Sequence, residues 1–88
     1  MDADAAWRLH PQVSVRPEPF GALLYHFGTR KLSFLKDRTL LELVDALGES
    51  DSAVAACDRV GIPVDDRPRY LRALATLEAS AMIEERAA

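Results

Sequence analysis

The sequence has little cysteine, no long apolar run and no excess of positive charge, and each shortage excludes a class of protein. Cys57 is the single cysteine among 88 residues, so no internal disulfide can form and nothing indicates an oxidising compartment. No stretch is long enough to span a bilayer, and the acidic amino end lacks the basic start and apolar run of a signal peptide. We therefore expect a cytoplasmic protein with no membrane partner.

The charge balance argues against general nucleic-acid binding. The formal net charge is -3, whereas neutralising phosphates requires a basic face. With 49% hydrophobic and 28% charged residues, the composition is that of a folded domain, and the length predicts a single domain over residues 1–88. A core of this size leaves little room for an internal catalytic cavity, which favours a binding surface.

Residues that could carry chemistry are few and scattered. His10 and His26 are far apart in the sequence and form no set with ligand spacing together with Cys57. On an apolar helix face Cys57 is expected in the core, and Trp7 is expected either in the core or on a partner surface, with the core favoured. We therefore expect no catalytic residue, no metal site and no cofactor.

Residues 13–36 show the pattern of short strands joined by turns. Apolar residues alternate with other residues in three stretches, with Val13 and Val15 in the first, Leu23 and Tyr25 in the second, and Leu32 and Phe34 in the third. Residues 28–30 form a compact hairpin loop in which Gly28 is expected to supply a positive φ. The prediction is a three-stranded antiparallel meander.

The period changes to about 3.6 after residue 37, which predicts three helices over residues 39–79. Thr39 and Glu42 have the spacing of a capping box, and Gly48 is a natural stop. Ser50 or Asp51 is expected to cap the second helix, closed by Gly61, and Asp65 or Asp66 the third. The tail from residue 80 is expected to be short and extended or frayed. The fold class is therefore α+β.

The third predicted strand, "KLSFLK" over residues 31–36, lies at an edge of the meander and is flanked by basic residues. Lysines commonly protect such an edge against aggregation. The same edge also suits an added strand, because its unpaired backbone groups can bind an extended peptide while a nearby helix supplies side-chain pockets. The residues alone leave both interpretations open.

The segments "RPEPFGALLYH" and "GTRKLSFL" carry a resemblance to a known family. From about Trp7 to Glu85 the chain resembles the mycofactocin biosynthesis peptide chaperones, which are stand-alone recognition elements for ribosomally made, modified peptides (RiPP recognition elements) similar to the pyrroloquinoline quinone biosynthesis chaperone. The resemblance implies three strands followed by three helices in a winged-helix-like arrangement. It also implies a non-catalytic chaperone.

The resemblance implies further that an acidic, hydrophobic leader of a short precursor peptide adds as a strand beside the third strand, in a cleft with the third helix. The complex would present the peptide to a radical S-adenosylmethionine (SAM) maturase that holds the iron–sulfur chemistry. Proline at Ser33 or Phe34 is then expected to weaken leader binding. The residues assigned to peptide binding are Arg30, Lys31, Leu32, Ser33, Phe34, Leu35, Arg69, Tyr70, Ala73 and Leu77. Leu71 and Leu74 are assigned to the core, and the rotation of the helix is left open by one residue.

Two alternatives belong to other functional classes. A winged-helix protein could bind DNA through "RPRYLR", although Arg67, Arg69 and Arg72 are few and lie beside acidic residues. A small homodimerisation module could pair the third strand with its own copy. Measuring the mass with and without peptide would separate dimerisation from peptide capture.

Overall fold

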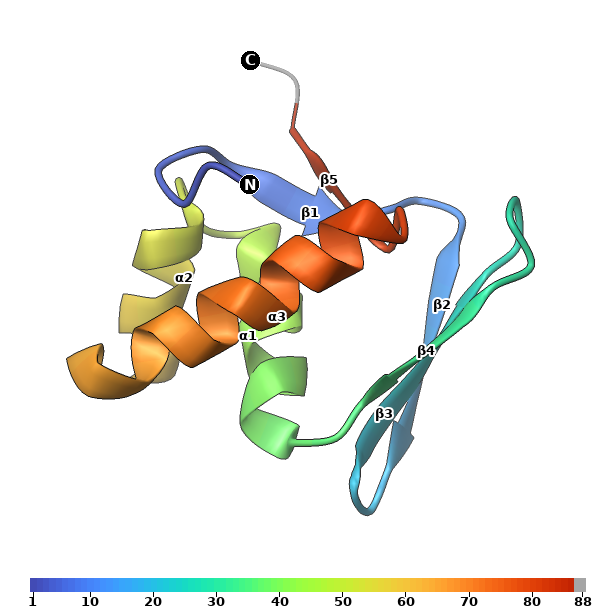
Figure 1. Cartoon of the computed structure of the whole chain (residues 1–88), viewed down its shortest axis with the longest axis horizontal. Coiled ribbons are helices and arrows are strands. Elements are labelled where there is room, and N and C mark those ends of the chain that lie inside the picture. The colour runs from blue at the N-terminus through green and yellow to red at the C-terminus, as the bar shows by residue number, and fades with distance from the viewer. Residues whose placement is uncertain (87–88) are drawn as a thin grey trace.

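The computed structural model describes residues 1–86, which fold into two antiparallel sheets and three α-helices (Figure 1). The elements in chain order are β1 (Trp7–Leu9), β2 (Val13–Glu18), β3 (Gly21–His26), β4 (Leu32–Leu35), α1 (Arg38–Leu47), α2 (Ala53–Val60), the 3₁₀ turn η1 (Val64–Asp66), α3 (Arg67–Ala79) and β5 (Ile83–Glu85). The predicted α+β class with three helices is confirmed.

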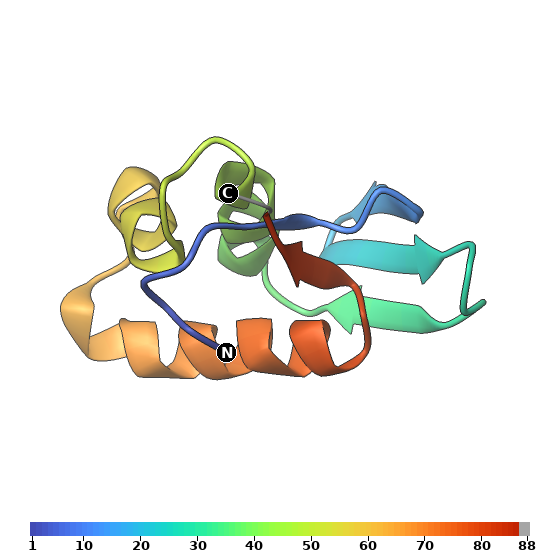
Figure 2. The ribbon, with the colours of Figure 1, turned by 90° about the horizontal axis from the view of Figure 1, so that it is seen from above.

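The larger sheet has the strand order β2-β3-β4, with β3 paired antiparallel to both neighbours. Side chains alternate between its two faces. Ala22, Leu24 and Leu35 are buried on the inner face, which packs on the helices, whereas Leu32 and Phe34 stand on the outer face. Figure 2 shows that β4 is the strand of this sheet nearest to α3.

The second sheet joins the two ends of the described chain and was not expected from the sequence. β1 pairs antiparallel with β5, with Trp7 opposite Glu85 and Leu9 opposite Ile83. Trp7 is 2% exposed, which confirms its predicted place in the core. The tail predicted as short and extended or frayed is an ordered strand up to Glu85, and residues 87–88 of that prediction lie outside the described residues.

Two predicted helix caps are wrong. Asp37, and not Thr39, caps α1, because the Asp37 side chain accepts a hydrogen bond from the Leu40 N–H at 3.1 Å. Ser52 caps α2 in place of Ser50 or Asp51, again by accepting from the N–H three residues on. Gly61 closes α2 as predicted, with φ 84°. Asp66 holds the predicted position before α3, but its side chain makes no capping hydrogen bond.

The β3–β4 turn uses its glycine differently from the prediction. Arg30 has the positive φ, 61°, whereas Gly28 does not. Residue 28 instead lies in a crowded position, since a Cβ there would lie 2.5 Å from the Gln12 side chain and 2.9 Å from the His26 ring. The His26 ring holds the turn, because its Nδ1 accepts the N–H groups of Gly28 and Thr29 at 3.0 and 3.1 Å.

The core lies between the inner face of the larger sheet and the three helices. Its largest fully buried side chains are Leu24, Leu35, Leu43, Leu47, Leu74, Met82, Ile83, Val44 and Cys57. Cys57 is therefore the core residue that the sequence predicted. Within residues 1–86, no helix combines the length and the apolar character that crossing a membrane requires.

Candidate functional site

A groove with a volume of about 410 Å³ lies between β4 and α3, the two elements that sequence reasoning singled out. We call it the β4–α3 groove. Its walls are formed by Leu32, Ser33, Phe34, Leu35, Leu40, Ala73, Thr76 and Leu77. Leu35, Leu40, Ala73 and Leu77 contribute apolar side chains between β4 and the helices, so the groove suits an apolar ligand. Leu32 and Phe34, whose side chains stand on the outer face of the sheet, border the groove along the edge of β4.

The α3 wall follows from helical spacing. Ala73, Thr76 and Leu77 are separated by three and four residues, so their side chains lie on one face of α3. Ala73 and Thr76 are short, which leaves volume between the helix and β4, while Leu77 is 5% exposed and forms the floor. Leu40, in the first turn of α1, extends the wall toward the end of β4.

The opposite wall ends in the open edge of β4. The strand order leaves β4 without a second partner strand among residues 1–86. An edge strand presents a row of unpaired N–H and C=O groups that another extended chain can pair with. The groove therefore combines an apolar surface with a backbone edge.

The register shows which backbone groups are free on that edge. The His26 N–H donates to the Lys31 carbonyl at 3.0 Å, and this pair continues the β3–β4 register. Bonded and non-bonded pairs alternate along an antiparallel ladder. Ser33 and Leu35 therefore pair with β3, and the amides and carbonyls of Leu32 and Phe34 point to the open edge.

The β2–β3 ladder supports this assignment independently. The Phe27 N–H donates to the Gln12 carbonyl at 2.8 Å, so the odd-numbered residues of β3 bond to β2 and the even-numbered ones to β4. Pro17, which has no N–H, then occupies a non-bonded position opposite Ala22. The two ladders of the sheet therefore give the same alternation of bonded and non-bonded positions along β3.

Asp37 and Tyr70 connect the end of β4 to α3. The Tyr70 hydroxyl donates to the Asp37 carboxylate at 2.6 Å, in addition to the cap bond from Leu40. Burial by itself raises the pKa of Asp37, but the hydrogen bonds from Tyr70 and from the first turn of α1 outweigh it. Together with the charge of Arg69 they hold the pKa of Asp37 below its ordinary value, and the hydrogen bond to Asp37, with burial, raises the pKa of Tyr70.

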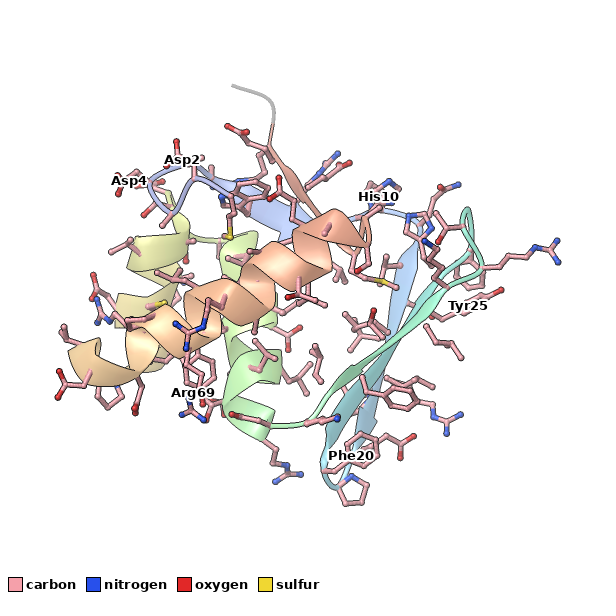
Figure 3. All side chains as sticks on the ribbon, in the orientation of Figure 1. Asp2, Asp4, His10, Phe20, Tyr25 and Arg69 are labelled. Carbon is pink, nitrogen blue, oxygen red and sulfur yellow. The ribbon has the colours of Figure 1, made fainter. Side chains whose placement is uncertain are left out.

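The structure brings six of the ten predicted peptide-binding residues together and leaves four outside the groove walls. Leu32, Ser33, Phe34, Leu35, Ala73 and Leu77 line the groove. Tyr70 is 8% exposed and packs one turn before Ala73, and the Arg69 guanidinium lies 4.9 Å from the centre of the Tyr70 ring. Figure 3 shows Arg69 near the first turns of α3. Arg30 and Lys31 are exposed in the turn before β4.

Two groove residues were missed from the sequence. Leu40 and Thr76 line the groove but were not among the predicted peptide-binding residues. The spacing of Thr76 from Ala73 and Leu77 was a signal that could have found it, once one of these residues was placed in a cleft. The predicted core positions Leu74 and Leu71 are buried and partly buried, respectively.

The scattered histidines are closer in space than the sequence suggested. The His10 and His26 ring centres are 4.4 Å apart, and each Nδ1 accepts backbone N–H groups. Within the described part of the chain, no group of three or more His, Cys, Asp or Glu side chains is placed to hold a metal ion. Both histidines instead accept hydrogen bonds from backbone N–H groups of their own loops.

The arginines near α3 are not arranged as a phosphate-binding surface. The Arg67 guanidinium contacts the Asp58 carboxylate at 2.6 Å and donates to the Ile62 carbonyl at 3.0 Å. Arg67 is therefore held by the protein itself, and only Arg69 and Arg72 of this segment remain for an outside partner. Two charges are too few for a strong nucleic-acid footprint.

Comparisons with known proteins relate the chain to one family. The sequence model of the Peptide chaperone MftB family matches residues 6–84. Peptide chaperone MftB of Mycobacterium tuberculosis is 56% identical over 85 residues, which cover 97% of this chain and 78% of that protein. The protein of the same name from Mycolicibacterium smegmatis is 56% identical over 82 residues, covering 93% of this chain and 80% of that protein. No solved structure matches the chain.

Proposed function

The chain belongs to the Peptide chaperone MftB family, and from this premise we propose that it binds the leader of the mycofactocin precursor peptide in the β4–α3 groove. It then presents the peptide to a radical SAM maturase. The observation that carries the proposal is the open edge of β4 beside an apolar groove of about 410 Å³. A peptide chaperone is a non-catalytic role, in agreement with the expectation that the chain is not an enzyme.

Binding proceeds by strand addition in a winged-helix-like fold. An extended leader pairs with the free amides and carbonyls of Leu32 and Phe34 and becomes a fourth strand of the larger sheet. Every second side chain of the added strand faces α3 and enters the groove, where it contacts Leu35 and Leu77. Backbone pairing supplies affinity, and the groove supplies selectivity for apolar residues.

The remaining predicted residues act around the groove. Tyr70 and Asp37 hold α3 at a fixed distance from the end of β4, so they set the width of the groove through the 2.6 Å hydrogen bond. Arg30, Lys31 and Arg69 form no ion pair within residues 1–86. Their charges are available to steer an acidic leader toward the groove.

The proposal is tested by adding a synthetic leader of the mycofactocin precursor to the isotope-labelled protein. We expect saturable binding, with the largest amide chemical-shift changes at Leu32, Phe34 and the α3 residues from Ala73 to Leu77. A leader of the same composition in scrambled order is the control. Absence of binding, or shift changes confined to β1, β5 and α2, would overturn the proposed groove.

The presentation step needs a separate experiment with the maturase. Turnover of the full precursor by the purified maturase is expected to require this chain at stoichiometric amounts. A precursor without its leader should react no better with the chain than without it. Equal turnover of the intact precursor with and without the chain would contradict a chaperone role in presentation.

A further inference from the structure

The outer face of the larger sheet carries apolar side chains that the core does not use. We define the outer apolar face as Phe20, Leu23, Tyr25, Phe27, Leu32 and Phe34. The exposed fractions of Phe20, Phe27, Leu32 and Phe34 are 49%, 61%, 55% and 59%. Only Met1 and Val64 are comparably exposed large apolar residues elsewhere in residues 1–86, so the exposure is concentrated on one surface.

The register makes this surface continuous. Leu23 lies opposite Phe34, and Tyr25 lies opposite Leu32, at the non-bonded positions where side chains of neighbouring strands are closest. The Phe20 and Phe34 rings are 6.5 Å apart, and the Tyr25 and Phe27 rings meet edge to face at 5.1 Å. Figure 3 shows Phe20 at the turn between β2 and β3, and Tyr25 toward the other end of the sheet.

The outer face is not apolar throughout. On β2 the same face carries Ser14, Arg16 and Glu18, and Arg16 forms an ion pair with Glu18 at 2.6 Å. The face is therefore polar over β2 and apolar over β3 and β4, on the side that adjoins the open edge. A partner that covered the whole sheet would also lie on the charged β2 side, whereas an added strand beside β4 meets only the apolar side.

Resting on the proposed function, we propose that the leader is recognised on both faces of the strand that it adds. Neighbouring strands lie about 4.8 Å apart, and successive side chains point to opposite faces. When one set of leader side chains enters the β4–α3 groove, the alternate set stands beside Leu32 and Phe34 on the outer apolar face. The matching leader segment therefore carries large apolar residues at two outward positions, two residues apart, besides those that enter the groove.

Substitutions on the protein provide the first test. Leu32→Thr and Phe34→Thr keep a strand-forming residue while removing apolar contact area. Each is expected to raise the dissociation constant of the synthetic leader, measured by calorimetry, several-fold and at most about tenfold. Val64→Thr is the matched control, because Val64 is 73% exposed in η1, in the connection between α2 and α3, and the same change there should leave the affinity unchanged.

Substitutions on the leader provide a second test that does not depend on folding of the variants. Serine is placed at each position of the bound segment in turn, and binding to the unmodified protein is measured. Loss of affinity at both alternate sets of positions supports recognition on both faces. Loss at one set only, with Leu32→Thr and Phe34→Thr binding normally, overturns this inference and leaves groove binding intact.

A second copy of the chain or the maturase could cover the outer apolar face instead, and each would give a different experimental result. If the threonine variants change the solution mass of the protein but not its leader affinity, the face pairs with a second copy. If they bind the leader normally but no longer support turnover by the maturase, the face contacts the maturase. Either result overturns the inference that the leader is recognised on both faces. If the unmodified protein binds no leader at all, both this inference and the proposed function are wrong.

Discussion

At the scale of single residues, the Asp37 carboxylate joins three elements. One oxygen accepts from the Leu40 N–H and so begins α1, while the other accepts from the Tyr70 hydroxyl of α3 at 2.6 Å. Asp37 itself follows β4 by two residues. The Asp37 carboxylate therefore links α3 to the end of β4, beside the core contacts of α3.

The first prediction concerns the charge of that carboxylate. Asp37→Asn keeps a capping side chain but removes the charge, so we expect the free energy of unfolding at pH 7 to fall by about 1 kcal/mol. Because the pKa of Asp37 is lowered in the folded protein, its contribution is present above its unfolded pKa of about 3.9 and is lost as the pH falls through the folded pKa. The difference between the two proteins should therefore shrink in that acidic range.

Urea unfolding of both proteins between pH 7 and pH 2.5 makes this measurement. Tyr70→Phe serves as the partner variant, because it removes the hydroxyl and should move the pKa of Asp37 back toward its ordinary value. A gap between wild type and Asp37→Asn that is independent of pH would show that the charge does not stabilise the fold.

At the scale of elements, β4 has two different edges, and the difference is testable with proline. The Ser33 amide belongs to the β3 ladder, whereas the Leu32 amide points to the open edge. Ser33→Pro is therefore expected to lower the free energy of unfolding by about 2 kcal/mol or more, because proline removes one hydrogen bond of the β3–β4 ladder and strains the strand. The sequence predicted that proline at Ser33 would weaken leader binding, but the register shows that this change first disrupts the β3–β4 ladder.

Leu32→Pro is the informative variant. Leu32 is the first residue of β4, a position where proline is tolerated, so the urea midpoint should stay close to that of Leu32→Ala. Leader affinity should nevertheless fall below that of Leu32→Ala, since only proline removes the edge donor. Equal affinities of the two variants would mean that the leader does not use this amide.

Sequence periodicity was sufficient for the strands and helices that form the groove, and it failed where contacts are distant. β1 and β5 have three residues each and pair across 76 positions, so neither contains enough residues to show a period. The caps of α1 and α2 were misplaced because several acceptor side chains precede each helix, and only the fold selects Asp37 and Ser52.

The candidate site was predictable on the strand and only partly on the helix. Alternation placed Leu32 to Leu35 at an edge, but the walls also depend on the rotation of α3 and on Leu40 from a third element. That rotation puts Tyr70 under the groove, where it binds Asp37, and puts Thr76 into the wall. Helical spacing could have added Thr76 to Ala73 and Leu77, but it could not show that Tyr70, in the same stripe, binds Asp37 and does not line the groove.

At the scale of the whole molecule, the net charge of -3 contrasts with the basic residues around β4. Lys31 and Lys36 flank the strand, are exposed, and form no ion pair within the described residues. If the leader is acidic, as the family resemblance implies, the positive charges of these lysines attract it toward β4, while the net negative charge of the protein repels it. Exposed pairs contribute about 0.2–1 kcal/mol each and are screened by salt, so the effect belongs mainly to the association rate.

The last prediction compares two double variants of equal charge. Lys31→Glu with Lys36→Glu, and Arg16→Glu with Arg59→Glu, each take the net charge from -3 to -7, but Arg16 lies on β2 and Arg59 on α2, away from the groove. Stopped-flow kinetics with the synthetic leader should show association slowed several-fold by the first pair at low salt, and clearly less by the second. Near 0.5 M salt, where the Debye length is about 4 Å, the two variants and the wild type should converge. Equal slowing by both pairs would assign the effect to net charge alone, and a wild-type rate that does not fall with salt would mean that the lysines only protect the edge of β4 and that the apolar groove accounts for recognition.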